Sequence, residues 1–232
     1  MTDTKIPNSA GNTLPHIYTI SGMGMNEKLF RKLDFPFPST HLPWIEPKKG
    51  ESLRDYSKRI GSIIPENQPV ILIGLSFGGV VALEMAEWLN PEKVVLISTI
   101  KTRKERPFFF RFMEYIPLYL FQNRALQNAT IGLWGPFFGI NNKADIRRVM
   151  GLFCDLSNDY FRWAIGQMVK LKRSSWKVDI VHIHGTKDRV FPSKYLQDAH
   201  LIEGGGHAMI IRESEAIAKI ISRFLTPELA ME

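Results

Sequence analysis

The sequence predicts an α/β protein with a mostly parallel sheet, and three observations support that fold class. Residues 70–73 form a continuous apolar run, which is typical of a strand that helices cover on both faces. A helical pattern follows at residues 80–89, and further apolar runs alternate with amphipathic stretches, as in βαβ units. The chain has 232 residues and is 44% hydrophobic, which is enough for one large core and excludes a disordered tail, a collagen-like repeat or a small disulfide-stapled scaffold.

Six short runs rich in apolar and β-branched residues are expected to be the strands. They cover residues 16–21, 40–44, 70–73, 93–98, 178–184 and 199–202. A helix is expected after Asn26, which suits an N-cap, and others over residues 52–64, 80–89 and 214–225. The last of these places Ile217, Ile221 and Phe224 on one face, as expected of a helix that packs against a sheet.

The middle of the chain, residues 101–177, differs in composition from the rest. It holds 14 Lys and Arg against five Asp and Glu, a balance of +9, whereas the remaining residues are at −2. It also holds nine of the 15 Phe and three of the five Trp. This shift indicates an insert with its own surface character, in which helices are expected at 107–123, 142–153 and 159–172. We therefore expect a core domain of residues 1–100 and 178–232 and a helical cap of residues 101–177.

A candidate nucleophile lies between the 70–73 strand and the helix after it. The sequence Gly74-Leu75-Ser76-Phe77-Gly78 matches G-x-S-x-G, the nucleophile elbow, in which a strand, a sharp turn and a helix expose a serine hydroxyl above the sheet. Gly74 and Gly78 permit so tight a turn because they carry no side chain. The pattern alone often arises by chance, but here the strand and the helix supply its context. We therefore predict that Ser76 is the catalytic nucleophile.

A serine hydroxyl needs a base, and the base needs a carboxylate, before it can attack at neutral pH. His207 follows three glycines, ahead of the last helix, and is the predicted base. Asp188 comes just past the end of the 178–184 strand, where active-site groups of parallel sheets collect, and is predicted to orient it. Glu203, close to His207 in sequence, is the alternative partner.

The oxyanion of an acyl-transfer intermediate needs hydrogen-bond donors, and two backbone N–H groups are predicted to supply them. One belongs to Phe77, directly after the nucleophile. The other belongs to Met23, in the loop after the first strand, where Gly22 and Gly24 allow the backbone to turn. A glycine turn without a functional role is the alternative for this loop.

The sequence offers little support for metals, nucleic acids or membranes as partners. His182 and His184 share a strand face, a spacing that suits metal ligands, but no cluster of Cys or carboxylates accompanies them, so no metal and no cofactor are expected. No nucleic-acid motif is present. No apolar run approaches the ~18 residues that span a bilayer. Because the single Cys154 cannot form an internal disulfide and the first stretch is polar, a cytoplasmic protein without an integral membrane segment is expected.

Taken together, these motifs resemble those of the α/β-hydrolase superfamily. The chain carries SGMG at 21–24, GLSFGG at 74–79, HGTKD at 184–188 and GGGH at 204–207, in the order of that family. It has Ser-Gly where many members have His-Gly at the start of the oxyanion loop, which leaves the backbone donor in place. The resemblance implies an α/β-hydrolase sheet of about six strands, helices on both faces, a helical cap insertion and a Ser-Asp-His triad.

The expected function is hydrolysis of a carboxylic ester or thioester through an acyl-enzyme intermediate. The aromatic residues of the insert suit a small-molecule substrate with an apolar acyl or aryl group, and its positive charge suits an anionic one, such as a thioester of coenzyme A or a carrier protein. Packing of the cap helices is the alternative reason for the aromatics. Two other classes stay open: a ligand-binding protein with little turnover, and a peripheral membrane binder that uses the basic insert.

Overall fold

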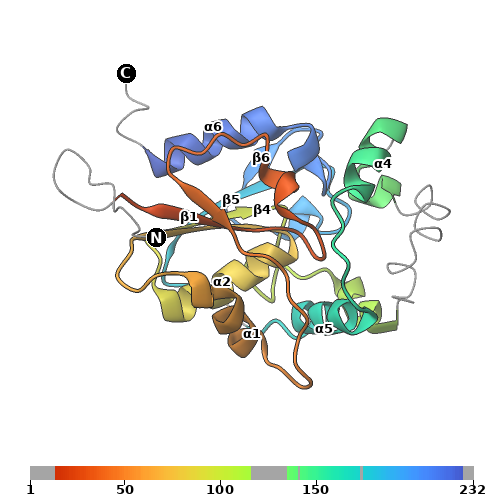
Figure 1. Ribbon diagram of the computed structural model, residues 1–232. Helices are drawn as coiled ribbons and strands as arrows, with labels where there is room; N and C mark the ends of the chain where they lie inside the picture. The colour runs from red at the N-terminus through yellow and green to blue at the C-terminus, as the bar shows by residue number, and fades with distance from the viewer. Residues whose placement is uncertain (1–13, 116–134, 141, 173–174, 227–232) are drawn as a thin grey trace.

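The computed structural model describes residues 14–115, 135–140, 142–172 and 175–226, and its centre is one sheet (Figure 1). All neighbouring strands of this sheet run parallel, in the order β2-β1-β3-β4-β5-β6. The strands are β1 (His16–Ile20), β2 (Ser39–His41), β3 (Val70–Leu75), β4 (Lys93–Ile97), β5 (Asp179–Gly185) and β6 (His200–Ile202). The parallel sheet of about six strands predicted from the sequence is therefore confirmed.

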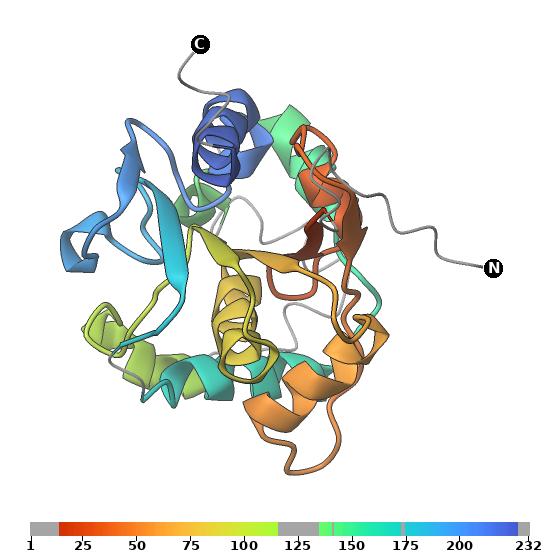
Figure 2. The same cartoon turned by 90° about the vertical axis from the view of Figure 1, so that its left-hand side faces the viewer.

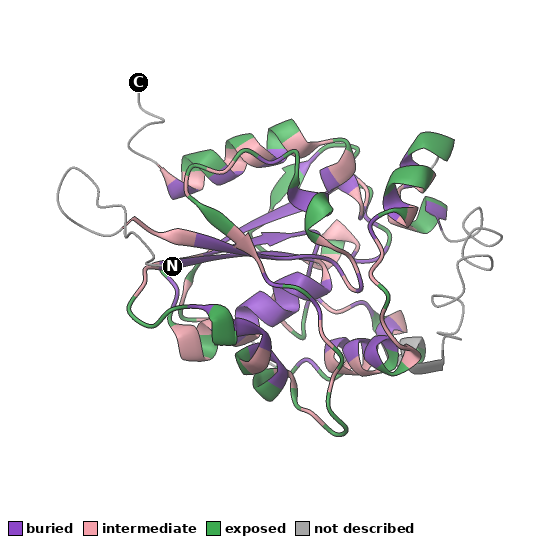
Figure 3. Cartoon of the chain, in the orientation of Figure 1, coloured by how far each residue is buried: buried purple, intermediate pink, exposed green. Residues whose placement is uncertain are grey.

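Helices cover the sheet on both faces, as Figure 2 shows. Helix α6 (Ser214–Leu225) lies on one face, and α1 (Leu53–Ile60) and α2 (Phe77–Leu89) lie on the other. Because side chains alternate along a strand, each central strand contributes to two cores. Ile73 of β3 packs in the same cluster as Ile217 of α6, whereas Leu72 packs in the cluster that contains Val81 of α2. This burial on both sides explains why residues 70–73 are apolar throughout (Figure 3).

Three elements of the amino-terminal half differ from the prediction. The second strand ends at His41 and not at Trp44, whose indole turns into the core and donates its Nε1–H to the Gly22 carbonyl oxygen at 2.9 Å. After Asn26, whose side chain caps it, the chain forms only the 3₁₀ turn η1 (Glu27–Phe30). The segment predicted as one helix over 52–64 is α1 followed by the 3₁₀ turn η2 (Gly61–Ile63).

Residues 101–177 contribute four described elements. They are the 3₁₀ helices η3 (Phe108–Tyr115) and η5 (Gly135–Phe138) and the helices α4 (Lys143–Met150) and α5 (Asn158–Val169). The helix expected over 107–123 is 3₁₀ helical as far as Tyr115, and the rest of it lies outside the described residues. The other two helices are present and are shorter than predicted. No helix in the described part of the chain is long and apolar enough to span a membrane.

The predicted site residues follow the carboxyl ends of three strands. Ser76 comes directly after β3, and Asp188 lies in the loop between β5 and the 3₁₀ turn η6 (Ser193–Tyr195). His207 lies between β6 and the 3₁₀ turn η7 (Met209–Ile211). Because the carboxyl ends of parallel strands share one edge of the sheet, residues far apart in sequence meet there.

Candidate active site

The turn between β3 and α2 holds Ser76 in an unusual backbone conformation, with φ 53° and ψ −120°. A serine adopts a positive φ only where the surrounding structure imposes it. The neighbouring glycines show what imposes it here: a Cβ at Gly78 would overlap the carbonyl oxygens of Ile20 and Ser21, and one at Gly74 would overlap the backbone of the first turn of α2. The strand, the turn and the helix are therefore packed as a nucleophile elbow requires.

A continuous chain of hydrogen bonds joins the three residues predicted as a triad. The Oγ of Ser76 lies 2.9 Å from Nε2 of His207, and Nδ1 of His207 lies 2.9 Å from Oδ2 of Asp188. With Asp188 ionised, Nδ1 carries the proton and donates to the carboxylate, which leaves Nε2 free to accept from the Ser76 hydroxyl. The arrangement can withdraw a proton from Ser76 during attack on a carbonyl.

The Asp188 carboxylate is buried and fully engaged. Its Oδ1 accepts the backbone N–H groups of Val190 and Phe191 at 2.8 and 2.9 Å, and Oδ2 faces both His207 and His184. Burial alone would raise the pKa of this carboxyl, but the two histidines outweigh it and the pKa lies below its ordinary value. The side chain is therefore charged at neutral pH and can stabilise an imidazolium at His207.

The alternatives to this assignment do not reach the site. Glu203 is exposed, and Asp188 occupies the position beside His207 that it would need. His182 and His184 each place Nε2 near a backbone carbonyl oxygen, of Thr99 at 3.1 Å and of Phe191 at 2.8 Å. Burial, followed by the neighbouring His184 and a lysine, lowers the pKa of His182 to about 3. Within the described residues, no group of three or more His, Cys, Asp or Glu could hold a metal ion.

Both predicted oxyanion donors lie beside Ser76. Phe77 is the first residue of α2, and Met23 lines the same cavity as Ser76 and His207. In the described chain neither residue donates its backbone N–H to another backbone group. Gly24 has φ +68°, a conformation that favours glycine, and a Cβ at Gly22 would lie 3.1 Å from the Leu75 side chain.

Two supporting residues were not found by sequence reasoning. Thr99, which follows β4, donates its hydroxyl to the Ser76 carbonyl oxygen at 2.7 Å and so fixes the elbow from the side. His184, considered from the sequence as one of two histidines with metal-ligand spacing, lies 3.2 Å from Asp188. His184 and Asp188 are the first and last residues of HGTKD, four positions apart, so this motif offered a signal for their contact, whereas no local motif indicated Thr99.

An apolar cavity opens beside Ser76 and His207. The insert supplies much of its wall, and Leu75, Val190 and Phe191 supply further apolar surface from the core. The lining residues from the insert include Phe110, Phe138, Phe153, Phe161, Ile165 and Met168. Such a wall favours an apolar group next to the candidate nucleophile. Arg147, Arg148 and Arg162, which lie within residues 101–177, are exposed, so these three positive charges face solvent.

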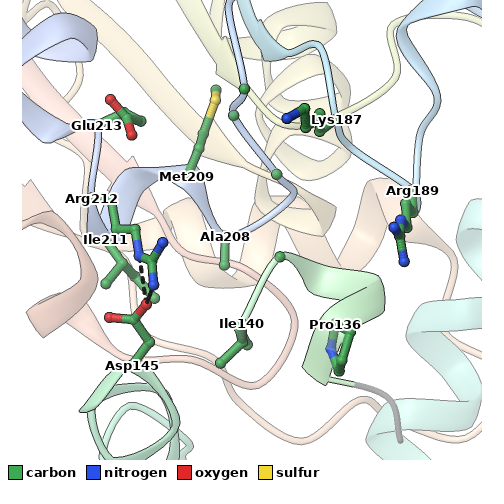
Figure 4. Close-up of a pocket in the computed structure, with 14 residues that line it drawn as sticks. Pro136, Ile140, Asp145, Lys187, Arg189, Ala208, Met209, Ile211, Arg212 and Glu213 are labelled. Atoms are coloured by element: carbon green, nitrogen blue, oxygen red, sulfur yellow. Dashed lines mark hydrogen bonds and ion pairs between the residues drawn. The ribbon is translucent and has the colours of Figure 1, made fainter. Parts of the chain in front are cut away.

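A second cleft, the polar cleft, is lined by charged side chains and by the three glycines that precede His207 (Figure 4). It shares three lining residues with the apolar cavity, which are Ile140, Ala208 and Ile211. Across its floor Arg212 donates to Asp145 at 2.6 Å (Figure 4). Two further cations, Lys187 and Arg189, line the cleft on either side of Asp188 in sequence, and both are exposed.

The comparisons with known proteins agree with the fold. A family model described as alpha/beta hydrolase matches residues 11–220. None of the curated proteins matches the sequence significantly. A solved hydrolase from Pseudomonas aeruginosa PA01 is similar at 13% identity with a TM-score of 0.69, covering 95% of this chain and 92% of its own. A lipase-esterase related protein from Clostridium acetobutylicum ATCC 824 is similar at 16% identity with a TM-score of 0.63. This match covers 90% of this chain and 94% of the related protein. Polyneuridine aldehyde esterase is similar at 15% identity with a TM-score of 0.60, and the match covers 91% of this chain and 99% of the esterase.

Proposed function

The chain belongs to the alpha/beta hydrolase family, and on that premise we propose that it hydrolyses a carboxylic ester or thioester with Ser76 as the nucleophile. The observation that carries the proposal is the unbroken hydrogen-bond chain from Ser76 through His207 to Asp188. Structures similar to this chain include an esterase and a lipase-esterase related protein, which favours the same class of substrate.

In the proposed reaction, Ser76 Oγ attacks the substrate carbonyl carbon while Nε2 of His207 takes the hydroxyl proton. The backbone N–H groups of Met23 and Phe77 stabilise the oxyanion that forms, and the Asp188 carboxylate stabilises the imidazolium. His207 then protonates the leaving alcohol or thiol, which leaves an acyl group on Ser76. A water molecule, deprotonated by His207, attacks this acyl-enzyme, and Ser76 is regenerated with release of the carboxylic acid.

Substitution of the nucleophile tests the proposal. S76A should lower kcat for p-nitrophenyl butyrate by about 10⁵ to 10⁶, because loss of a triad nucleophile removes the acyl-enzyme route. A fluorophosphonate probe should label Ser76 in the wild-type chain, as peptide mass spectrometry would show. If S76A hydrolyses the ester at near the wild-type rate, the assignment is wrong. If the folded wild-type chain is neither labelled nor active, a ligand-binding role with little turnover is favoured.

Residues 101–177 act in this proposal as a cap that selects the acyl group. The support is the cavity wall, because aromatic side chains of this segment, among them Phe138 and Phe161, line the same cavity as Ser76. An ester panel of increasing acyl length tests this selection. F138A should shift the preferred length, because Phe138 lines the cavity and its ring lies 5.5 Å from that of His207. An unchanged preference would contradict a selecting role for this residue.

A second candidate substrate is an anionic thioester, and the polar cleft favours it. Lys187 and Arg189 line a cleft that adjoins the apolar cavity, where they would face the charged part of a leaving group such as coenzyme A. The double variant K187E/R189E should raise KM for butyryl-CoA at least tenfold and leave p-nitrophenyl butyrate within twofold. K219E, a charge reversal on the exposed surface of α6, is the matched control and should change neither. Equal effects of the double variant on both substrates would contradict this substrate class.

A further inference from the structure

The loop that carries the Met23 donor is fixed from both sides through its backbone. Trp44, on the core side, donates its indole N–H to the Gly22 carbonyl oxygen at 2.9 Å. That oxygen belongs to the same planar peptide unit as the Met23 N–H, and the two point in opposite directions across a trans peptide. Trp44 therefore fixes the direction of the proposed oxyanion donor from one side of Met23.

The insert fixes the next two peptide units of the same loop. The Oη of Tyr160, a fully buried residue of α5, accepts the Gly24 N–H at 3.3 Å. Cys154, just before α5, donates its backbone N–H to the Gly24 carbonyl oxygen at 2.7 Å. Asn26 donates its backbone N–H to the Leu152 carbonyl oxygen at 2.8 Å, and this bond and the Cys154 bond together form the β-bridge between Met25 and Phe153. The chain after Met23 is therefore hydrogen-bonded to residues 152–160.

The packing around Gly24 leaves this loop little freedom. Gly24 has φ +68°, and a Cβ there would lie 2.7 Å from the ring of Phe161, the residue after Tyr160. The oxyanion loop, the turn at Cys154 and the start of α5 are thus in direct contact. A donor held in this way keeps its direction during the reaction, which is what electrostatic stabilisation of a transition state requires.

We propose that Tyr160 is a positioning residue for the oxyanion hole, so that residues 152–160 of the insert set the catalytic rate as well as covering the site. The inference rests on the proposed function, because it assigns a purpose to the Met23 N–H in hydrolysis. Tyr160 itself does not touch the reacting atoms. It acts through Gly24, by fixing the peptide unit that follows Met23.

Removal of one hydroxyl tests the proposal. Y160F keeps the ring and deletes the acceptor of the Gly24 N–H, so kcat for p-nitrophenyl butyrate should fall about tenfold while KM stays within twofold. This loss is smaller than the ~10²–10³ expected when an oxyanion donor is deleted outright, because Met23 keeps its N–H. A boronic acid, whose tetrahedral adduct places an oxygen in the oxyanion hole, should bind Y160F more weakly by a similar factor.

Y18F is the matched control. Tyr18 of β1 is also a buried tyrosine, and its hydroxyl donates to Oε1 of Gln68 at 3.0 Å, outside the oxyanion loop. It should leave kcat and boronic acid affinity within twofold of the wild type. C154P removes another bond to the same loop, because proline lacks the N–H that Cys154 donates to the Gly24 carbonyl oxygen. It should give the same loss in kcat with little change in KM.

Hydrogen–deuterium exchange gives a readout that does not depend on turnover. The amides of residues 22–25 should exchange at least fivefold faster in Y160F than in the wild type or Y18F. The proposal is overturned if that exchange is unchanged, or if folded Y160F and C154P both keep wild-type kcat. Should Y160F fail to fold, C154P alone decides. Failure of the proposed function would show separately, as hydrolysis that survives in S76A.

Discussion

The Nε2 atom of His184 lies 3.2 Å from Oδ2 of Asp188, so the carboxylate that orients His207 also faces a second histidine. The same Nε2 lies 2.8 Å from the Phe191 carbonyl oxygen, and both rings on Asp188 are buried. His184 thus holds the loop that carries Asp188 in place, and its Nε2–H group stabilises the charged form of the Asp188 carboxylate.

Replacement of His184 by phenylalanine should slow the reaction without removing any reacting group. H184F keeps a ring of similar size and loses the N–H, so kcat should fall about tenfold, the size expected for one hydrogen bond to a charged group at about 1.5 kcal/mol. The pKa of Asp188 should rise, which the pH dependence of unfolding would show. H182F, at the neighbouring inward position of β5, is the control, since His182 bonds to Thr99 and not to Asp188. A wild-type kcat in H184F would contradict this role.

The elbow should tolerate no side chain at Gly78. G78A places a methyl group against the carbonyl oxygens of Ile20 and Ser21, and the backbone there has no room to yield. We expect a loss of at least about 2 kcal/mol in the free energy of unfolding, measured by urea denaturation. G166A in α5 is the matched control, because nothing lies within 4 Å of a Cβ there. Alanine within a helix should stabilise that site by up to about 1 kcal/mol, so equal effects at the two positions would refute the packing argument.

Acid should destabilise the fold partly through His182. Burial lowers its pKa to about 3, whereas an unfolded histidine has a pKa near 6.5. Between these values the unfolded chain binds a proton that the folded chain does not, so stability falls as pH drops below 6.5. From pH 7.5 to pH 5 this group should cost the wild type about 2 kcal/mol. Between pH 7.5 and pH 5, the free energy of unfolding of H182Q, measured by urea denaturation, should fall by about 2 kcal/mol less than that of the wild type. Equal decreases in the two proteins would contradict the expectation.

The sequence predicted most of the sheet because its signals are local. The apolar run at 70–73 identified β3, and the predicted bounds of α6 match the structure because its apolar face repeats with helical period up to Leu225. The second strand was extended too far because Leu42 and Trp44 are apolar, as strand residues often are. Whether Trp44 continues the strand or turns toward Gly22 depends on a partner in another loop, which no local pattern encodes.

The same distinction applies to the candidate site. Ser76, Asp188 and His207 were predicted because each lies in a short motif after a strand, and the structure brings the three side chains together. The contact of Tyr160 with Gly24 spans 136 residues and leaves no trace in the sequence near either one. A tyrosine at the start of an aromatic helix is read as core packing, and only the folded chain shows which backbone group its hydroxyl meets.

Both outer strands of the sheet are three residues long, β2 at one end and β6 at the other. Each therefore exposes few unpaired N–H and C=O groups to a neighbouring molecule, although Leu201 at the β6 end is 53% exposed. Long, flat outer strands invite edge-to-edge pairing between copies, and short ones offer too little backbone for it. The short outer strands thus disfavour self-association of the protein by strand addition at either edge of the sheet.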